Sequence, residues 1–185
     1  DLKRTFCFHI GGRLIRFVPD TARVTGFTWA GQVAASRAGV DLQAGKTLSS
    51  DHISKIAGVL ADALLSFIAG QPDDLARKLA IGNMAVSRER ADLVTFSGGV
   101  GGLFYQGRSG EKLLRFGDFG PFLADALRLR MEKEEIAAAK PGETILATVI
   151  GAGIHTVGIS GSTIYLSHPS DLPVRDIPVV SLGDT

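Results

Sequence analysis

Residues 93–102 read LVTFSGGVGG, in which a short apolar run passes directly into a glycine-rich stretch. A continuous apolar run such as residues 93–96 is typical of a strand that is buried on both faces of a sheet. Glycine has no Cβ and adopts positive φ readily, so residues 97–102 can bend sharply and lie close to a ligand. The segment therefore predicts a buried strand that delivers the chain to a glycine loop, as in α/β folds.

A second segment of the same kind follows at residues 145–153, which read ILATVIGAG. We expect a strand over residues 145–150 and a glycine turn over residues 151–153. Between the two segments, a helix is expected over residues 120–132, because Pro121 has the fixed φ that suits a first helical turn.

The N-terminal part of the chain predicts further strands. Residues 5–10 and 14–18 are β-rich runs on either side of Gly11 and Gly12, and they predict a hairpin. A third run at residues 23–29 alternates imperfectly between apolar and polar residues and predicts another strand.

Residues 51–68 give the clearest helix signal, because apolar residues recur every three or four positions along one face. Ser49 or Ser50 can accept a hydrogen bond as the N-cap of this helix. A shorter helix is expected over residues 73–80, with one of its first two aspartates at its N-terminus.

The complete pattern predicts the fold class. With late strands expected at residues 162–166 and 178–180, the order is strands, helices, strand, glycine loop, helix, strand, glycine loop and strand. This order is typical of an α/β fold in which helices pack against a mixed sheet. The chain has 185 residues and neither a fixed repeat nor a clear linker, so residues 1–185 are expected to form a single unit.

Charge and cysteine content exclude several classes of protein. The 20 basic and 19 acidic residues give a formal net charge of +1. This balance provides no strong field to gather nucleic acid or an anionic membrane surface, so neither is expected as a partner. The single cysteine, Cys7, cannot form an internal disulfide and fits a reducing compartment, so we expect the cytoplasm.

Two stretches bear on targeting. Residues 145–166 carry no formal charge and are long enough to span a bilayer, but their glycines and polar side chains favour a buried core. The chain begins at Asp1 with neither a methionine nor the charged and apolar regions of a signal peptide. We therefore expect this chain to be an internal fragment of a longer protein, and we expect no secretory or transit signal within the chain itself.

Glycine bends at strand ends often hold nucleotides, because ligands in open α/β sheets lie beyond the carboxyl ends of the strands. Residues 97–102 are not a Walker loop, since no Gly-Lys-Ser or Gly-Lys-Thr follows, and they lack the third glycine of a dinucleotide fingerprint. On these residues alone, a nucleotide site and a tight turn into a helix both remain open. At residues 151–153, close packing between elements is the favoured interpretation.

Short motifs occur in a fixed order along the chain. They are CFHIGGRLI at residues 7–15, VTFSGGVG at 94–101, FGDFGPFLA at 116–124, ATVIGAGIHT at 147–156 and ISGSTI at 159–164. Together they resemble the EutA family of ethanolamine ammonia-lyase reactivating factors. The resemblance spans nearly the whole of this chain but less than half of the family's chain, and ordered motifs are far more specific than one glycine loop.

The resemblance implies part of an actin-like (ribonuclease H-like) ATPase fold, in which two lobes close over ATP as in actin, hexokinase and heat-shock-70 proteins. Within that fold, residues 97–101 resemble the adenosine motif, whose backbone lies against the sugar and the α-phosphate. Gly151 and Gly153 resemble the second connecting motif, a small-residue helix contact at the interlobe hinge. The nucleotide-binding residues that the resemblance implies are Ser97, Gly98, Gly99, Val100, Gly101, Gly151 and Gly153.

The two phosphate motifs of this fold, which would bind Mg²⁺ and the β- and γ-phosphates, are expected to lie outside this sequence. Residues 118–120 (DFG) have Asp-x-Gly spacing, but Pro121 and a helix follow where a strand-turn-strand is required. Gly102 also departs from the family, whose members tend to carry glutamate after the glycine loop. We expect a nucleotide-binding lobe without the N-terminal phosphate-motif region, with no catalytic residue, no protein metal site and no ATP hydrolysis by the fragment alone.

For the intact protein, the resemblance implies an ATP-dependent, chaperone-like reactivase. It would release damaged cobalamin from ethanolamine ammonia-lyase so that adenosylcobalamin can rebind. ATP/ADP with Mg²⁺ would be its cofactor, the lyase would be its partner, and cobalamin would belong to the lyase. It would act in the cytoplasm, in or near a bacterial microcompartment.

Two other functions remain open from the residues. A dinucleotide-dependent oxidoreductase needs an acidic residue at the end of a second strand to hold a ribose. The candidate after the second glycine turn is Asp171, which lies in a loop-like stretch beside Pro173. A non-catalytic interaction domain would use its glycines for packing alone.

Overall fold

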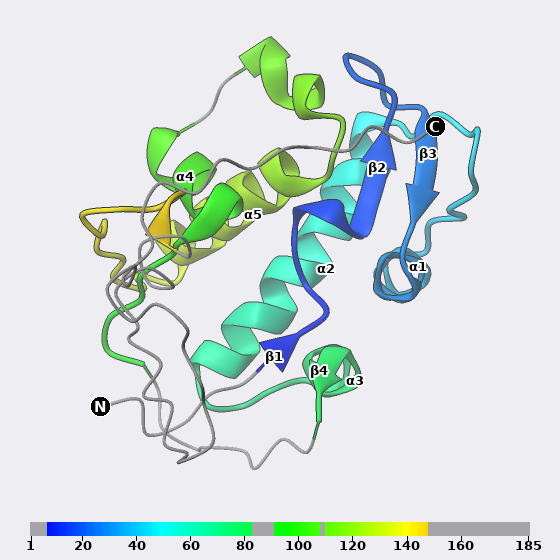
Figure 1. Ribbon diagram of the computed structural model, residues 1–185. Helices are drawn as coiled ribbons and strands as arrows, with labels where there is room; N and C mark the ends of the chain where they lie inside the picture. Colours follow the sequence, from blue (N-terminus) through cyan, green and yellow to red (C-terminus); the bar gives the residue numbers. More distant parts are fainter. Residues whose placement is uncertain (1–6, 83–90, 108–109, 148–185) are drawn as a thin grey trace, which may run out of the picture.

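The computed structural model describes residues 7–82, 91–107 and 110–147, and Figure 1 shows how their elements are arranged. The strands are β1 (Cys7–Phe8), β2 (Ile15–Phe17), β3 (Val24–Phe27) and β4 (Ala80–Ile81). The helices are α1 (Trp29–Arg37), α2 (Ser50–Ile68), α3 (Asp74–Leu79), α4 (Gly98–Gln106) and α5 (Gly120–Lys133), with 3₁₀ turns η1 (Gly12–Leu14) and η2 (Gly110–Phe116).

Helix α2 runs through the middle of the described part, with α5 packed along it and α1 and α3 against its other sides (Figure 1). Its N-cap is Ser49, whose hydroxyl accepts a hydrogen bond from the backbone N–H of His52 at 3.2 Å. Its apolar stripe, which includes Ile53, Ile56 and Leu60, is buried. The helix predicted over residues 51–68 is therefore confirmed.

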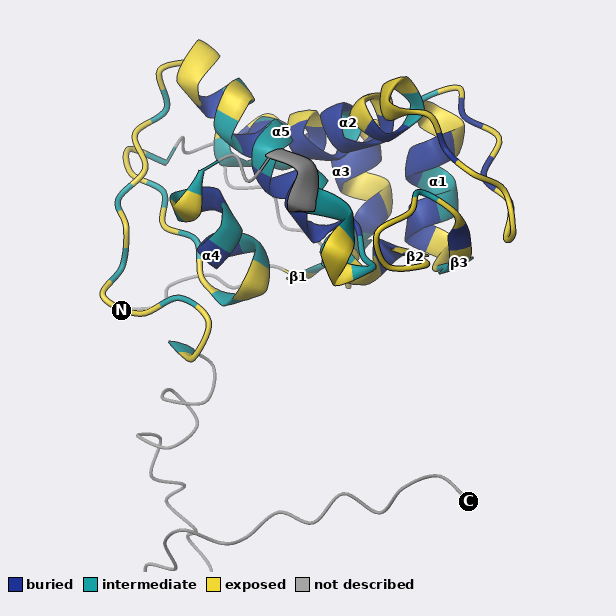
Figure 2. Cartoon of the chain, turned by 90° about the horizontal axis from the view of Figure 1, so that it is seen from above, coloured by how far each residue is buried: buried dark blue, intermediate teal, exposed yellow. Residues whose placement is uncertain are grey.

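The hydrophobic core lies between α2, α5 and the neighbouring elements, and Figure 2 shows buried residues concentrated along these two helices. Its largest fully buried side chains are those of Phe119, Ile15, Ile56, Leu60, Leu79, Leu123 and Leu127. The predicted helix over residues 120–132 is confirmed as α5, with Pro121 in its first turn. The predicted short helix is confirmed as α3, where Asp73 accepts a hydrogen bond from Ala76 N at 2.6 Å.

The strand pairing differs from the predicted hairpin. Strand β1 pairs antiparallel with β4, which lies far along the chain, and β2 pairs antiparallel with β3. The two glycines between β1 and β2 do not reverse the chain, because Gly11 is extended and Gly12 begins the turn η1. The predicted strand at residues 23–29 is shorter than expected, since Trp29 already belongs to α1.

The expectation that residues 93–96 form a strand buried on both faces of a sheet is also wrong. Val94 forms a single parallel bridge with Ala138, and its N–H donates to the carbonyl of Ala137 at 3.0 Å. Leu93 is 58% exposed, so this segment lies at the surface and is not covered on both faces. An apolar run shows that a segment can be buried, but it does not show which segments pair with it. Here the single bridge to Ala138 does not extend into a sheet.

The second predicted strand, over residues 145–150, begins instead as a turn. Ala147 N donates to the carbonyl of Thr144 at 3.3 Å, and Ile145 and Leu146 are exposed. Residues 148–150, the glycine turn at 151–153 and the late strands lie outside the described residues.

The described part is thus a mixed α/β structure with two small antiparallel sheets and packed helices. Among the described helices, none is both long and apolar enough to cross a membrane. Most of the uncharged stretch over residues 145–166 lies outside the described residues.

Candidate functional site

A cavity of about 640 Å³ lies beside the first turn of α4. Five parts of the chain form its walls: η1, α4, the end of η2, the start of α5 and the turn near residue 145. The lining residues are Gly12, Arg13, Gly99, Val100, Leu103, Gln106, Arg115, Phe116, Asp118, Gly120 and Ile145. The structure therefore brings two of the residues expected to bind nucleotide, Gly99 and Val100, to one cavity.

The glycine stretch is helical, which corrects the expectation of a loop. Ser97 holds the N-cap position with extended backbone, but its side chain makes no capping hydrogen bond. Gly98 has φ +75°, a conformation that favours glycine, and its N–H donates to the carbonyl of Thr144 at 2.7 Å. The expected sharp bend is thus confined to Ser97 and Gly98, and α4 begins immediately.

The remaining glycines of α4 face different surroundings. A Cβ on Gly99 would meet no atom within 4 Å, whereas one on Gly101 would lie 2.7 Å from the carbonyl carbon of Phe96. A Cβ on Gly102 would lie 3.2 Å from the side chain of Ile145. Gly101 and Gly102 therefore permit close packing, and Gly99 presents bare backbone to open space.

Tyr105, in the last turn of α4, joins this helix to the segments on either side of it in the sequence. Its hydroxyl donates to the carbonyl of Ala139 at 2.6 Å and accepts from the N–H of Phe96 at 3.0 Å. The rings of Phe96 and Phe104 lie 4.6 Å apart between centroids. These contacts connect α4 to the segments around Phe96 and Ala139, and no local pattern predicts the bond between Tyr105 and Ala139 because the two residues lie far apart in the sequence.

Asp118 lies in the cavity wall but has a structural partner. Its carboxylate accepts a hydrogen bond from Gly120 N at 2.8 Å, and Phe119 N donates to the carbonyl of Gly12 at 2.8 Å. A Cβ on Gly12 would lie only 3.1 Å from the Cα of Gly120, so η1 and α5 meet at bare backbone. This agrees with the expectation that residues 118–120 begin a helix and do not form a phosphate hairpin.

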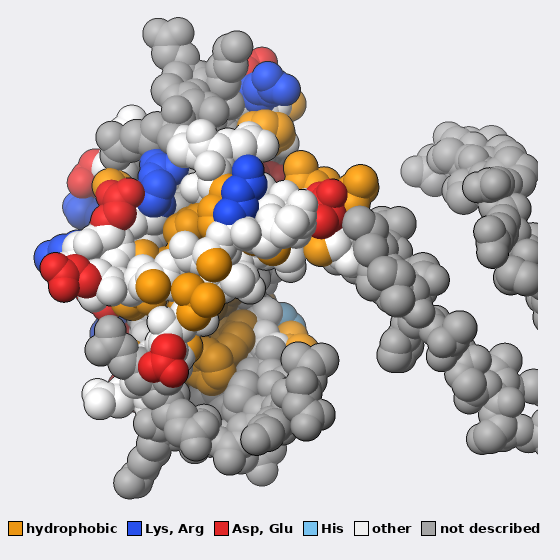
Figure 3. Space-filling view, turned by 90° about the vertical axis from the view of Figure 1, so that its left-hand side faces the viewer, with side chains coloured by type: hydrophobic (Ala, Val, Ile, Leu, Met, Phe, Trp, Pro, Cys, Tyr) orange, Lys and Arg blue, Asp and Glu red, His pale blue; other side chains and the backbone are white. Residues whose placement is uncertain are grey.

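Two arginines give the cavity a positive rim that sequence reasoning missed. Arg13 comes from η1 and Arg115 from η2, so only the tertiary structure places them together. The guanidinium of Arg115 lies 5.1 Å from the ring centroid of Phe116, within the range of a cation–π contact. Figure 3 shows hydrophobic and charged side chains intermixed on the side of the molecule where α4 lies.

The remaining two residues that were expected to bind nucleotide come from the second glycine turn. Gly151 and Gly153 lie outside the described residues, so the expected hinge contact stays a prediction. Within residues 7–82, 91–107 and 110–147, no three His, Cys, Asp or Glu side chains are placed so that they could hold a metal ion.

Comparison with known proteins adds an independent line of information. The family profile described as "Ethanolamine utilisation protein EutA" matches residues 1–185. The ethanolamine ammonia-lyase reactivase EutA of Salmonella typhimurium (strain LT2) is 34% identical over 178 residues, which cover 95% of this chain and 37% of that protein. The protein of the same name from Escherichia coli (strain K12) is 33% identical over the same shares. No solved structure matches.

Proposed function

Because this chain belongs to the EutA family of ethanolamine utilisation proteins, we propose that it is part of an ATP-dependent reactivase for ethanolamine ammonia-lyase. The reactivase would release damaged cobalamin from the lyase so that adenosylcobalamin can rebind. Two curated relatives carry the name of reactivases of that enzyme, which supports the proposed partner. The chain spans 37% of the length of these relatives, so we propose that it supplies only one part of the reactivase.

That contribution is the wall of a nucleoside pocket within an actin-like ATPase fold. The observation that carries it is the cavity of about 640 Å³ onto which the bare backbone of Gly99 opens. This volume lies within the range of small-molecule pockets, which have mainly apolar walls and a few placed polar groups. Val100, Leu103 and Ile145 supply the apolar wall. A ribose or a purine ring can approach Gly99 because no side chain covers it.

The phosphate side of the nucleotide is assigned to the positive rim. Arg13 and Arg115 line the same cavity as Gly99, and a guanidinium presents a fork of donors that matches phosphate oxygens. The first turn of α4 adds the partial positive charge of a helix N-terminus. Both features favour an anionic ligand over a neutral nucleoside.

The described residues of this cavity do not provide a set of ligands for the Mg²⁺ that would accompany ATP. Within the described part of the cavity wall, Asp118 is the single carboxylate, and it already accepts a hydrogen bond from Gly120 N. Mg²⁺ needs near-octahedral oxygen coordination, and phosphoryl transfer depends on positioned metal and water. We therefore assign nucleoside and phosphate binding to this chain, and hydrolysis to the longer protein that contains it.

Reactivation requires that the nucleotide alter the affinity for the lyase. A ligand shifts a conformational equilibrium only as far as it binds the two states differently. ATP and ADP must therefore favour different lobe arrangements, and those arrangements must bind the lyase with different affinity. The proposed place of action is the cytoplasm, in or near a bacterial microcompartment, which is compatible with the free thiol of Cys7.

The test is Gly99→Val in the longer protein. The new side chain would project toward the cavity without meeting other atoms within 4 Å of its Cβ, so the fold should persist. We expect ADP affinity, measured by calorimetry, to fall at least tenfold. Gly142→Val is the matched control, because the Cβ of that residue also meets nothing within 4 Å and Gly142 does not line the cavity.

Three outcomes of this experiment are distinct. Loss of ADP binding in Gly99→Val alone supports the assigned site. Equal ADP affinity in the wild type and Gly99→Val contradicts it. Heat with NAD but none with ADP in the wild-type protein would replace the proposal by a dinucleotide-dependent oxidoreductase.

A further inference from the structure

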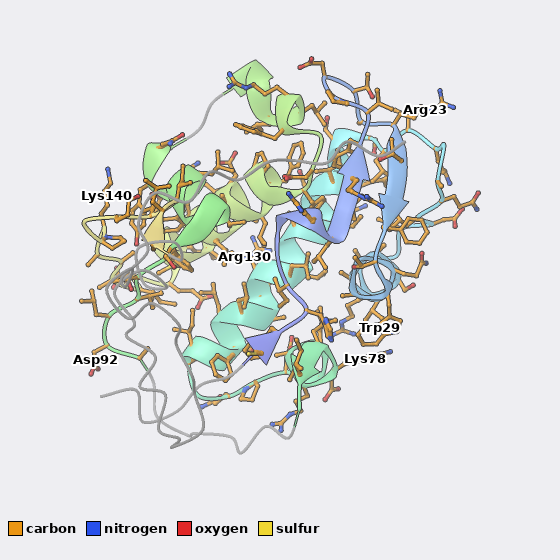
Figure 4. All side chains as sticks on the ribbon, in the orientation of Figure 1. Arg23, Trp29, Lys78, Asp92, Arg130 and Lys140 are labelled. Carbon is orange, nitrogen blue, oxygen red and sulfur yellow. The ribbon has the colours of Figure 1, made fainter. Side chains whose placement is uncertain are left out.

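A groove of about 440 Å³ between α1 and α3 has an exposed tryptophan at its edge. Trp29 is the single tryptophan of the sequence, and 55% of its surface is exposed. Figure 4 shows it beside Lys78 of α3, on the side of the molecule away from α4. An isolated exposed apolar residue is common on protein surfaces, so the case depends on what surrounds this one.

The fold gathers one face of each helix into this groove. On α1, Trp29, Gln32, Val33, Ser36 and Arg37 follow the spacing of a single helical face, and all five line the groove. The opposite face of α1 carries the small buried residues 30, 31, 34 and 35. A Cβ on Gly31 would lie 2.5 Å from the carbonyl oxygen of Leu14, which shows how closely that face packs.

Helix α3 completes the groove from the other side. Both α1 and α3 pack on α2, and Leu75 of α3 lies with Val33 of α1 in the lining. Asp74 and Lys78 lie on either side of Leu75 along α3 and also line the groove. The groove therefore combines apolar side chains with an aromatic edge and charged positions.

The charges of the groove are not neutralised within the part of the chain that the structure describes. Arg37 and Lys78 form no ion pair with the described residues, and neither does Asp74. Arg37 and Lys78 lie in the last turns of their helices, where the helix dipole favours cations. The dipole accounts for their position, but it leaves their side chains free to meet a carboxylate from another molecule.

We propose that this groove is a docking surface for an acidic segment of ethanolamine ammonia-lyase. An apolar side chain of that segment would cover Trp29, and carboxylates would meet Arg37 and Lys78. Tryptophan and arginine are the residue types that most often dominate the energetics of protein interfaces. The groove holds two cations against one carboxylate, and the whole chain has a net charge of only +1, which favours a local acidic segment over a nucleic acid. The identity of the partner rests on the proposed function.

The test measures lyase affinity of the longer protein by calorimetry for the wild type and four variants. We expect Trp29→Ala and Lys78→Glu each to weaken lyase binding at least tenfold. Asp74→Asn removes the single carboxylate of the groove, so lyase binding should tighten or stay equal. Lys140→Glu is the matched charge reversal at an exposed position away from the groove, and should leave lyase affinity unchanged. ADP affinity should stay at the wild-type value in all four, which shows that the fold is intact.

Hydrogen exchange locates the contact directly. On addition of the lyase, amides of residues 29–37 and 74–79 should gain protection, while those of residues 98–106 should not gain it at constant nucleotide. Protection confined to other surfaces would overturn the docking site.

The failures of the two proposals can be told apart. If the wild type binds the lyase and all variants bind it equally, the docking site is wrong and the proposed function stands. If the wild type does not bind the lyase in any nucleotide state, the proposed function fails, and the docking site fails with it. If Trp29→Ala changes the sedimentation mass of the protein but leaves lyase affinity unchanged, the groove joins copies of this chain, and the proposed occupant is wrong.

Discussion

Gly98, Gly99 and Gly101 lie within four positions of one another, and the space around each Cα is different. Gly98 adopts positive φ, Gly99 opens onto the cavity, and Gly101 packs against the backbone of Phe96. Within one turn of helix, glycine thus permits a left-handed backbone at one position, leaves the backbone open to the cavity at another, and allows close packing at a third. Substitutions that add only a methyl group can separate these roles.

Gly101→Ala should lower the free energy of unfolding by about 1 to 3 kcal/mol, the usual cost of overpacking. Its Cβ would lie 2.7 Å from the carbonyl carbon of Phe96, and backbone cannot give way as a flexible side chain can. Gly99→Ala is the matched change, and it should raise the free energy of unfolding by about 0.4 to 1 kcal/mol through the loss of unfolded-state entropy. Urea denaturation measures both, and equal shifts would contradict the assigned packing role of Gly101.

At the scale of elements, α2 and α5 are joined by their core and by one ion pair at the surface. Arg130 of α5 donates hydrogen bonds to both carboxylate oxygens of Asp62 on α2. The pKa of Arg130 is raised by these bonds. A Cβ on Gly58 would lie 2.9 Å from Nη2 of Arg130, so the guanidinium crosses α2 over a glycine.

Asp62→Asn should cost no more than about 1 kcal/mol of unfolding free energy, the upper end for exposed ion pairs. The side chains of Arg130 and Asp62 are 38% and 49% exposed, so solvent screens their attraction. The cost should shrink further in 1 M salt. Asp92→Asn, at an exposed carboxylate with no ion pair among the described residues, is the control in urea denaturation. A loss above about 2 kcal/mol would show that the pair has a larger role than its exposure allows.

The helices could be predicted from the sequence because their signals are local. Ser49 and Asp73 cap α2 and α3, and Pro121 lies in the first turn of α5, as expected from short-range rules. The resemblance to the EutA family, read from ordered motifs, is confirmed over the whole chain.

Strand pairing and the charged part of the site could not be predicted, because both depend on residues far apart in the sequence. Cys7 pairs with Ile81, and the sequence around neither residue predicts this pairing. Arg13 and Arg115 meet at the cavity only after η1 and η2 have packed beside α5. Gly99 was found from its glycine-rich context, but its difference from Gly101 is a property of the neighbours that surround each.

At the scale of the whole molecule, the cavity beside α4 and the Trp29 groove between α1 and α3 share no lining residue. They share one structural neighbour, the turn η1. Arg13 of this turn lines the cavity, while the carbonyl of Leu14 accepts a hydrogen bond from the N-cap residue of α1, Thr28, at 2.9 Å. The two surfaces are therefore joined through a few residues.

ADP should alter hydrogen exchange of the longer protein at residues 28–37 as well as at the cavity. The expected cause is the contact between η1 and the start of α1, which transmits any shift of Arg13. Residues 40–48, which do not line the cavity, serve as the internal control. Mass spectrometry of peptides with and without ADP measures the change. A response limited to the cavity would show that the two surfaces act independently.

The brevity of η1 has a thermodynamic consequence. Three residues, Gly12–Leu14, connect a wall of the ligand cavity to the first turn of α1, and Gly31 lets that helix pack directly on them. Binding free energies that are coupled through such a link are reciprocal. If ADP binds in the cavity and a protein partner binds against α1, as proposed, each would shift the equilibrium affinity for the other by the same factor.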